Sequence, residues 1–284
     1  MPETQELTYA IKEAGIDWLT VTCEAGETQE QFDDTGYRLL QWERSEGNEC
    51  KPWRFAGFEG LFCGGAALGK RDSLSVMRLS SVLAHQHWKR VYELATNCSR
   101  IDVQVTVSGV SNPAELIIDH HTEALAHIAN RIKPPHVGLR LSNQSSPTVY
   151  FNQRVSDRFG RIYDKGNESR LAYYEQCVRY EVQFNNRAAR AASFALAGSD
   201  RANANAQGFV RDFFTTRGIS CRWANTERQL FSLPRRRSNA DRSLEWLRRQ
   251  VSPAVRDLLE RGRVHEVVEA LGLSEFVTVR PTKK

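Results

Sequence analysis

The sequence predicts an α+β fold with an antiparallel-rich central sheet, flanking helices and a helical, basic C-terminal part. Segments rich in β-branched and aromatic residues cluster before residue 190, too closely spaced for a doubly wound parallel sheet. After Phe184 the composition shifts to alanine and arginine at helical spacing. We therefore expect an α+β domain over residues 1–190 and an arginine-rich helical region over residues 191–284.

The elements of the first domain follow from local composition and periodicity. Residues 16–22 are rich in β-branched and aromatic side chains, and residues 50–68 combine aromatic residues with glycine, which indicates short strands joined by tight turns. Further strands are expected over residues 74–79, 99–107, 137–142, 147–152, 158–164 and 176–184. Helices are expected over residues 80–96 and 114–132, the second closed by Pro134 and Pro135.

The C-terminal part is expected to consist of helices separated by loops. The helical segments predicted here are 187–217, 241–250 and 253–271. Gly262 and Gly272 are the predicted breaks, and residues 234–239, which begin with proline, form the clearest linker.

The net charge of +5 conceals an asymmetry along the chain. The first 50 residues are strongly acidic, residues 201–284 are strongly basic, and arginine supplies most of the 39 basic side chains. A polyanion-binding surface has this composition, and so does a solvated helical face with internal ion pairs. No apolar run reaches the roughly 20 residues of a membrane span, and the acidic start is unlike a secretory signal, so we expect a cytoplasmic protein with no membrane partner.

The six cysteines are widely scattered, and none forms a C-x-x-C pair. This spacing, without a signal segment, predicts reduced thiols. The close histidine pairs, His85 with His87 and His120 with His121, have no cysteine partner at zinc-finger spacing. We therefore expect no zinc site.

Alternation along three of the expected strands separates polar from apolar side chains. The apolar face of the 99–107 strand consists of Ile101, Val103, Val105 and Val107. The polar faces of the three strands carry Arg100, Asp102, Gln104 and Thr106, then Arg179, Glu181 and Gln183, then Arg161 and Tyr163. If these strands are neighbours in the sheet, carboxylates, arginines and a tyrosine converge on one surface.

These residue types suit metal-assisted cleavage of a phosphodiester. Asp102 and Glu181 offer the oxygen ligands that Mg²⁺ or Mn²⁺ prefers, and the metal polarises the phosphodiester. Tyr163 is the candidate nucleophile, and it needs a nearby cation because a free phenol has a pKa of about 10. The candidate helpers are Arg161, Lys165 and Arg179. Taken singly, such residues more often form surface ion pairs or pack in a core.

Short motifs in a fixed order carry a resemblance to a known family. They are Arg100-Ile101-Asp102, Thr148-Val149-Tyr150-Phe151, Asn152-Gln153-Arg154, Ser156, Arg158-Phe159, Arg161-Ile162-Tyr163-Asp164-Lys165-Gly166 and Val178-Arg179-Tyr180-Glu181-Val182, with residues 16–22 ahead of them. This series resembles the rolling-circle replication initiators, which are the replication initiation factor or Rep_trans proteins of plasmids and filamentous phages. The resemblance covers residues 15–190 and is weaker in the tail.

The resemblance implies an enzyme that nicks and rejoins DNA. It would cut one strand at a double-strand origin, keep the 5′ phosphate on a tyrosine and free a 3′-OH for a polymerase. Tyr163 matches the nucleophile, and Asp102 and Glu181 match the metal-binding acids. The chain departs from the family pattern at Thr106 and Gln183, where a second acid is common. Origin DNA, a second copy of the chain, a host helicase and a DNA polymerase are the partners that the family implies.

Several residues remain open as further members of this site. Asp17 is a candidate for another oxygen ligand, but alternation places it with Leu19 and Val21, so a buried or capping role is equally consistent. The rival tyrosines are Tyr150, Tyr173, Tyr174 and Tyr180, of which the adjacent pair Tyr173 and Tyr174 is the more serious rival.

Two other classes of protein remain as alternatives. A non-catalytic DNA-binding regulator of a plasmid or prophage would use the helical tail, with phosphate contacts from Arg235, Arg236, Arg237, Arg248 and Arg249. A tyrosine recombinase would use His87 and Arg90, but its catalytic domain is mostly helical, whereas Tyr163 is expected on a strand. The same objection applies to a paired-histidine metal site at His85 and His87, since that segment is expected to be helical.

Overall fold

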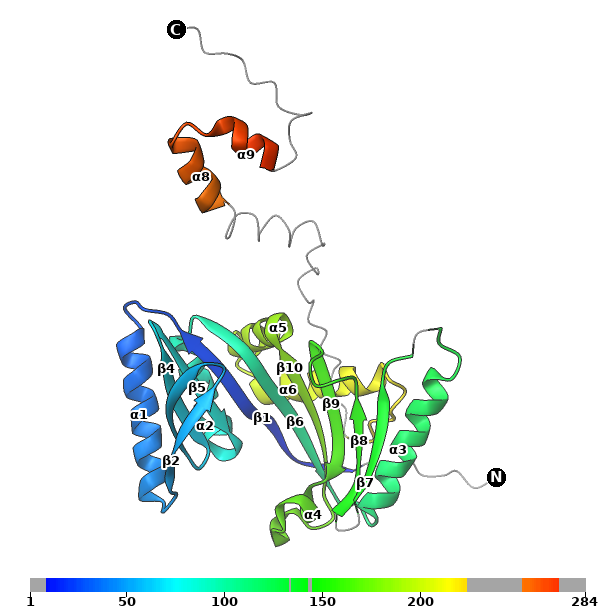
Figure 1. Ribbon diagram of the computed structural model, residues 1–284. Helices are drawn as coiled ribbons and strands as arrows, with labels where there is room; N and C mark the ends of the chain where they lie inside the picture. The colour runs from blue at the N-terminus through cyan, green and yellow to red at the C-terminus, as the bar shows by residue number, and fades with distance from the viewer. Residues whose placement is uncertain (1–8, 133, 143–144, 224–251, 271–284) are drawn as a thin grey trace. The chain divides into compact units, whose positions relative to one another are not determined.

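The fold is built on one large antiparallel sheet, and the expected α+β class is confirmed (Figure 1). This computed structural model describes residues 9–132, 134–142, 145–223 and 252–270. The ten strands have the order β2-β3-β4-β5-β1-β6-β10-β9-β8-β7. Their bounds are β1 Ala10–Cys23, β2 Cys50–Phe55, β3 Phe58–Cys63, β4 Ala66–Arg71, β5 Leu74–Ser80, β6 Asn97–Ser108, β7 Val137–Ser142, β8 Ser145–Phe151, β9 Arg158–Asp164 and β10 Val178–Asn185.

Five helices pack on one face of this sheet. They are α1 Gln29–Ser45, α2 Ser81–Leu94, α3 Pro113–Ile128, α5 Asn186–Ala197 and α6 Ala202–Thr215. In Figure 1, α5 and α6 lie behind the central strands, with α1 at one end of the sheet and α3 at the other. The opposite face, which we call the open face, carries none of these five helices. The short α4, Lys165–Ser169, and the 3₁₀ turn η1, Ala172–Tyr174, follow β9.

Along the central strands every second side chain is apolar and points into the core, as the sequence predicted. Val103 and Val105 on β6 and Val182 on β10 are fully buried. Phe213 and Phe214 from α6 complete this layer; Phe214 packs edge-on against Tyr180 of β10. Each large side chain buried in this way contributes roughly 1.5–3 kcal/mol of hydrophobic stabilisation. This layer holds β6, β10 and β9 in register, and so places their polar residues on the open face.

The helical part differs from the expectation in two places. The predicted helix over residues 187–217 is two helices, α5 and α6, because Gly198 ends the first and a short turn precedes the second. Helix α1, which the sequence analysis did not anticipate, buries Phe32, Leu39 and Leu40. Since α5 and α6 pack on the sheet, the first compact unit extends past residue 190 and divides from the second between Leu233 and Pro234.

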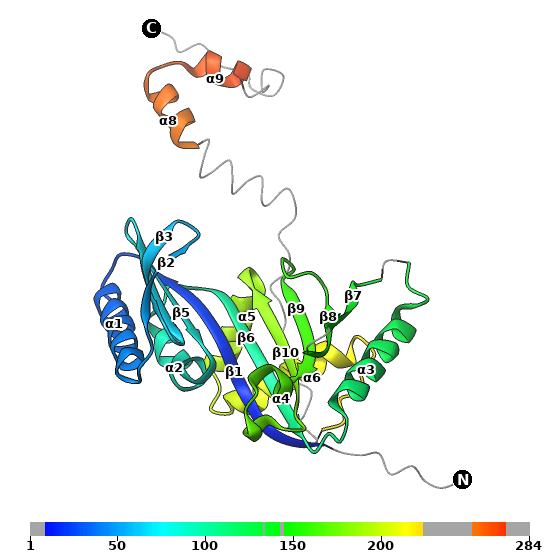
Figure 2. The ribbon, with the colours of Figure 1, turned by 60° about the horizontal axis from the view of Figure 1, so that its bottom comes forward.

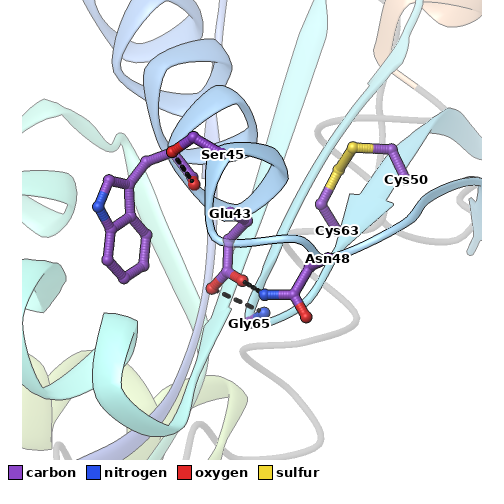
Figure 3. Close-up of a disulfide and its surroundings, with 7 residues drawn as sticks. Glu43, Ser45, Asn48, Cys50, Cys63 and Gly65 are labelled. Atoms are coloured by element: carbon purple, nitrogen blue, oxygen red, sulfur yellow. Dashed lines mark hydrogen bonds between the residues drawn. A yellow bond between two sulfur atoms is a disulfide. The ribbon is translucent and has the colours of Figure 1, made fainter.

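A disulfide contradicts the expectation that all six thiols are reduced. Cys50 on β2 and Cys63 on β3 stand directly opposite each other and are joined (Figure 3). Next to them Glu43, at the end of α1, accepts hydrogen bonds from the Asn48 side-chain amide at 2.5 Å and from the Gly65 backbone N–H at 3.0 Å. Spacing along the chain did not reveal the pair, because hairpin register brings the two sulfurs together.

The second unit contains α8, Ser252–Glu260, and α9, Val264–Ala270. The predicted break at Gly262 is confirmed, because this glycine lies between the two helices with a φ of +76°, which glycine adopts without strain. The expected helix over residues 241–250, the linker over 234–239 and Gly272 lie outside the described residues. Within the described parts of the chain, no helix is long and apolar enough to cross a membrane.

Candidate active site

The three strands with polar faces are direct neighbours, as the proposed convergence requires. In the order β6-β10-β9, Arg179 pairs with Thr106 on one side and with Tyr163 on the other. Glu181 pairs in the same way with Gln104 and Arg161. The period-2 alternation of strands then directs all these side chains to the open face. The candidate residues from the three strands therefore form one cluster.

Tyr163 is held at the centre of this cluster by a carboxylate and a guanidinium. Its hydroxyl donates a hydrogen bond to Glu181 Oε2 at 3.1 Å, and the guanidinium of Arg161 lies 5.0 Å from its ring centroid. The side chain is 7% exposed. Burial, together with the negative charge of Glu181, raises the pKa of Tyr163 well above its usual value, and the positive charges of Arg179 and Arg161 oppose this rise. The phenol is therefore protonated in this arrangement.

Glu181 and Asp102 are both buried carboxylates that pair with an arginine. Arg161 Nη2 donates to both oxygens of Glu181, at 2.7 and 2.9 Å. Arg100 donates to Asp102 through two nitrogens, at 2.8 and 2.5 Å. Burial raises the pKa of Asp102 to about 7, and the charge of Glu181 adds to this rise while Arg100 opposes it.

Arg179 connects β10 to β1, the strand on which the sequence left Asp17 open as a further member of the site. It is 3% exposed and donates hydrogen bonds to Thr106 Oγ1 at 2.9 Å, to Asp17 Oδ1 at 3.1 Å and to a carboxylate oxygen of Glu13. Thr106 and Gln104 also donate to Glu13, at 3.3 and 3.1 Å. Glu13 therefore brings a carboxylate to the region where Thr106 replaces the acid of the family pattern.

The position of Asp17 is decided by a β-bulge. The pairing of β1 with β6 shifts between Ile16 and Trp18, so Asp17 is an extra residue on β1. Ile16 and Leu19 stay in the core, while the Asp17 carboxylate reaches Arg179 on the open face. Burial and the charge of Glu181 raise the pKa of Asp17. Strict alternation had grouped Asp17 with Leu19 and Val21, and the bulge removes that constraint.

The donor types fit a hard divalent cation. Asp102, Glu181 and Asp17 offer carboxylate oxygens on one face, and the charge of Glu181 contributes to the raised pKa values of both aspartates, a repulsion that a bound cation would relieve. In the described ranges no three His, Cys, Asp or Glu side chains are grouped closely enough to form a ready metal cage. A cation would compete with Arg100, Arg161 and Arg179 for the same oxygens.

Lys165 lies at the edge of this cluster, where its positive charge opposes the rise in the pKa of Asp17. Lys165 begins α4, donates to Glu168 Oε2 at 2.6 Å and lies 5.3 Å from the Tyr174 ring centroid. The predicted DNA contacts Arg235, Arg236, Arg237, Arg248 and Arg249 lie outside the described residues.

The rival tyrosines occupy different positions. Tyr180 points into the core, where its hydroxyl lies 2.7 Å from His120 Nε2, so it does not reach the open face. Tyr174 donates to Glu13 Oε2 at 3.0 Å, and Tyr173 is exposed. Tyr150 pairs with Arg161 across β8 and β9, and both line a pocket of about 210 Å³ that also includes Tyr163. Tyr150 is thus the rival that shares the pocket of Tyr163.

Comparison with known proteins gives the family. The model of the family described as "Replication initiation factor", Rep_trans, matches residues 97–268, which is more than half of the chain. The chain belongs to the replication initiation factor family. A comparison with curated proteins finds no match. Among solved structures, the rolling circle replication initiator protein from Geobacillus stearothermophilus is similar, with 16% identity and a TM-score of 0.44 over 72% of this chain and 96% of that one.

The family match covers most of the cluster but not all of it. β6, β9 and β10 lie within residues 97–268, so Asp102, Tyr163 and Glu181 are inside the matched region of this replication initiation factor. β1 precedes it, and so Glu13 and Asp17 are additions from outside that region.

Proposed function

We propose that this replication initiation factor starts rolling-circle replication by nicking one strand of origin DNA with Tyr163. The observation that carries the proposal is the hydrogen bond from the Tyr163 hydroxyl to Glu181, with Arg161 bound to the same carboxylate. A nucleophile, a proton acceptor and a cation for phosphate charge are thus within contact of one another. This is the set that transfer of a phosphodiester to a phenol requires.

In the proposed step, Tyr163 Oη attacks the scissile phosphorus. The phenolic proton passes to Glu181, whose Oε2 lies 3.1 Å from the Tyr163 hydroxyl. This transfer lowers the cost of ionising the buried phenol. The bond from phosphorus to the 3′ oxygen breaks, and the 5′ phosphate remains on tyrosine. The 3′ oxygen takes a proton from solvent water and leaves as a hydroxyl, while Glu181 returns its proton to solvent. Arg161 offsets charge on the phosphoryl oxygens. Rejoining is the reverse reaction.

We further propose that Asp102 and Glu181, with Asp17 beside them, hold Mg²⁺ or Mn²⁺. When bound, such a metal supplies Lewis-acid polarisation of the phosphodiester. Since the carboxylates now bind arginines, we expect nicking to require millimolar rather than trace metal. Asp102→Asn and Glu181→Gln should lose nicking while keeping DNA binding. Normal nicking by both variants in chelating buffer would contradict the metal proposal.

The test of the nucleophile compares Tyr163→Phe with Tyr150→Phe. Supercoiled plasmids that carry the DNA flanking the gene are incubated with full-length protein and Mg²⁺ or Mn²⁺, and relaxation and covalent protein–DNA product are measured. We expect wild type and Tyr150→Phe to nick and Tyr163→Phe to lose at least a hundredfold in rate. Nicking that persists in Tyr163→Phe and disappears in Tyr150→Phe would move the nucleophile to β8. Tight binding without nicking by any form would favour a non-catalytic regulator.

A further inference from the structure

The open face continues from the candidate active site along β1 and onto β5, β4, β3 and β2, and there it carries aromatic rings and arginines. Arg78 on β5 and Arg100 on β6 pair with Thr20 on either side of β1. On the other side of Arg78, Ala67 on β4 pairs with Phe62 on β3. The side chains of this surface, which we call the aromatic–arginine face, are Trp18, Trp53, Phe55, Phe62, Arg78 and Arg100.

Arg78 is the centre of this face. Its guanidinium carbon lies 4.9 Å from the ring centroid of Trp18 and 5.1 Å from those of Trp53 and Phe62. The guanidinium carbon of Arg100 lies 4.4 Å from the ring centroid of Trp18. Three rings from three strands thus surround one cation. In the part of the chain that the structure describes, the one charged group that acts on Arg78 is Arg100, and no carboxylate pairs with it.

The rings lie on the side of the sheet away from the helices. Helix α1 packs on the opposite side, where Gly36 meets Leu68 and Met77, whose neighbours Ala67 and Arg78 point to the open face. Glycine and alanine on β4 leave room for the rings: a Cβ at Gly69 would lie 3.1 Å from the Trp53 ring. Phe55, which stacks on Trp53 at 5.7 Å, is 48% exposed. The five helices therefore leave these rings uncovered.

Arg100 joins this face to the candidate active site. Its guanidinium binds Asp102 and also lies over Trp18. Strands in a sheet are about 4.8 Å apart, so the path from Tyr163 on β9 to Phe62 on β3 spans six steps, or about 29 Å, across the sheet. It also runs about 20 Å along the strands, because Tyr163 is level with Glu13 of β1 and Phe62 is level with Thr20. A strand of several nucleotides covers that distance. Figure 2 shows the β2–β3 hairpin at the far end of this path, beside α1.

We propose that the aromatic–arginine face binds single-stranded DNA that continues from the phosphate at Tyr163, with bases stacked on Trp18, Trp53 and Phe62. This proposal rests on the proposed nicking function. Aromatic rings interleaved with arginines form the usual binding surface for unpaired bases, because every base has a flat face that can stack on a ring. In a duplex those faces are stacked on each other and unavailable. Arg78, without a carboxylate partner among the described residues, supplies positive charge for the phosphates.

The experiment measures binding without cleavage. Full-length protein is titrated, in chelating buffer, into a fluorescent 16-nucleotide DNA of mixed sequence, and Kd is read by anisotropy. We expect Trp53→Ala and Phe62→Ala each to weaken binding by about five- to a hundredfold, which is the range for loss of one stacked base. Arg78→Gln should also weaken binding, through the lost positive charge. The matched controls are Trp42→Ala on α1 and Phe194→Ala on α5, exposed aromatic residues on helices. They are expected to bind like wild type.

Two further measurements distinguish a loss of base stacking from a loss of charge and from misfolding of a variant. An abasic oligonucleotide with the same phosphates should bind wild type at least as weakly as the normal one binds Trp53→Ala, because it can stack on none of the rings. If Trp53→Ala loses secondary structure by circular dichroism, Phe55→Ala at the exposed end of β2 replaces it. Equal Kd values for face variants and helix controls, or full affinity for the abasic strand, would overturn the proposal. Because no metal is present, this result is independent of whether wild type nicks plasmid DNA.

Discussion

At the scale of single residues, the candidate site is a set of buried charges in which each carboxylate bonds to an arginine. Glu181 is shared between Arg161 and Tyr163, and Arg179 binds Asp17 and Glu13 on another strand. Burying ions is costly unless they are paired and hydrogen-bonded. The cluster is therefore positioned by its own hydrogen bonds and ion pairs, and replacing one of its residues should alter the positions of the others.

Asp102 should make the stability of the protein depend on pH. Its pKa is raised from 3.8 to about 7, so between pH 4 and 7 the folded state holds a proton that the unfolded state has lost. The free energy of unfolding should therefore fall as pH rises through this window. Asp102→Asn should flatten the fall, by a few kcal/mol in total. Urea unfolding at several pH values in chelating buffer checks this. Asp157→Asn, which changes a more exposed carboxylate, should keep the wild-type slope; parallel curves for all three proteins would contradict the expectation.

Arg179 should be the most sensitive arginine for folding. Arg179→Met removes one cation and leaves Glu13 and Asp17 near each other without it, so we expect a loss of about 3–5 kcal/mol in the free energy of unfolding. Arg38→Met on α1 breaks an exposed pair with Asp34 and should cost under about 1 kcal/mol. Chemical unfolding of both variants measures the difference. Equal losses would mean that Arg179 does not organise the cluster.

At the scale of elements, a β-bulge and a disulfide act on the strands that form the open face. The β-bulge at Asp17 brings a carboxylate to the polar side of β1 without disturbing Leu19 in the core. The disulfide between Cys50 and Cys63 joins the strands that carry Trp53 and Phe62. The bulge extends the candidate site, and the disulfide anchors the far end of the aromatic–arginine face.

The disulfide should stabilise the β2–β3 hairpin locally. It closes a short loop, with a sequence separation of 13, for which the chain-entropy gain is about 3 kcal/mol. We expect reduction, or Cys50→Ser, to speed hydrogen exchange in peptides from residues 50–63 and to leave peptides from β6 and β10 unchanged. Cys221→Ser, which changes a free cysteine, is the control. Six titratable thiols in the denatured, unreduced protein would rule out the bond.

At the scale of the whole molecule, the chain consists of a sheet-based unit and a smaller second unit that begins at Pro234. The basic excess belongs to the C-terminal third of the sequence. The proposed chemistry lies in the first unit, and the arginine-rich segment at residues 235–237 falls just inside the second. Specific binding of duplex origin DNA is therefore expected to depend on a different part of the chain from cleavage.

The salt dependence of DNA binding tests this division. Replacing Arg235, Arg236 and Arg237 by glutamine should reduce the slope of log K against log salt by up to about 3, because each phosphate contact on duplex DNA contributes about 0.9. Arg261→Gln with Arg263→Gln is the matched control, since both arginines pair with neighbouring acids on α8 and α9. An unchanged slope in the triple variant would identify residues 235–237 as a solvated linker.

The sequence by itself determined the class of fold, most strands and the sorting of β6, β9 and β10 into an apolar and a polar face. These properties are local, because side-chain direction repeats every two residues. It also placed Asp102, Tyr163 and Glu181 together, through a family resemblance. The tertiary structure alone decided the strand order, the approach of Glu13 and Asp17, the pairing of Cys50 with Cys63 and the ring of aromatic side chains around Arg78. Those depend on pairing between distant segments and on a bulge, and no periodicity within one segment encodes which strand lies beside it.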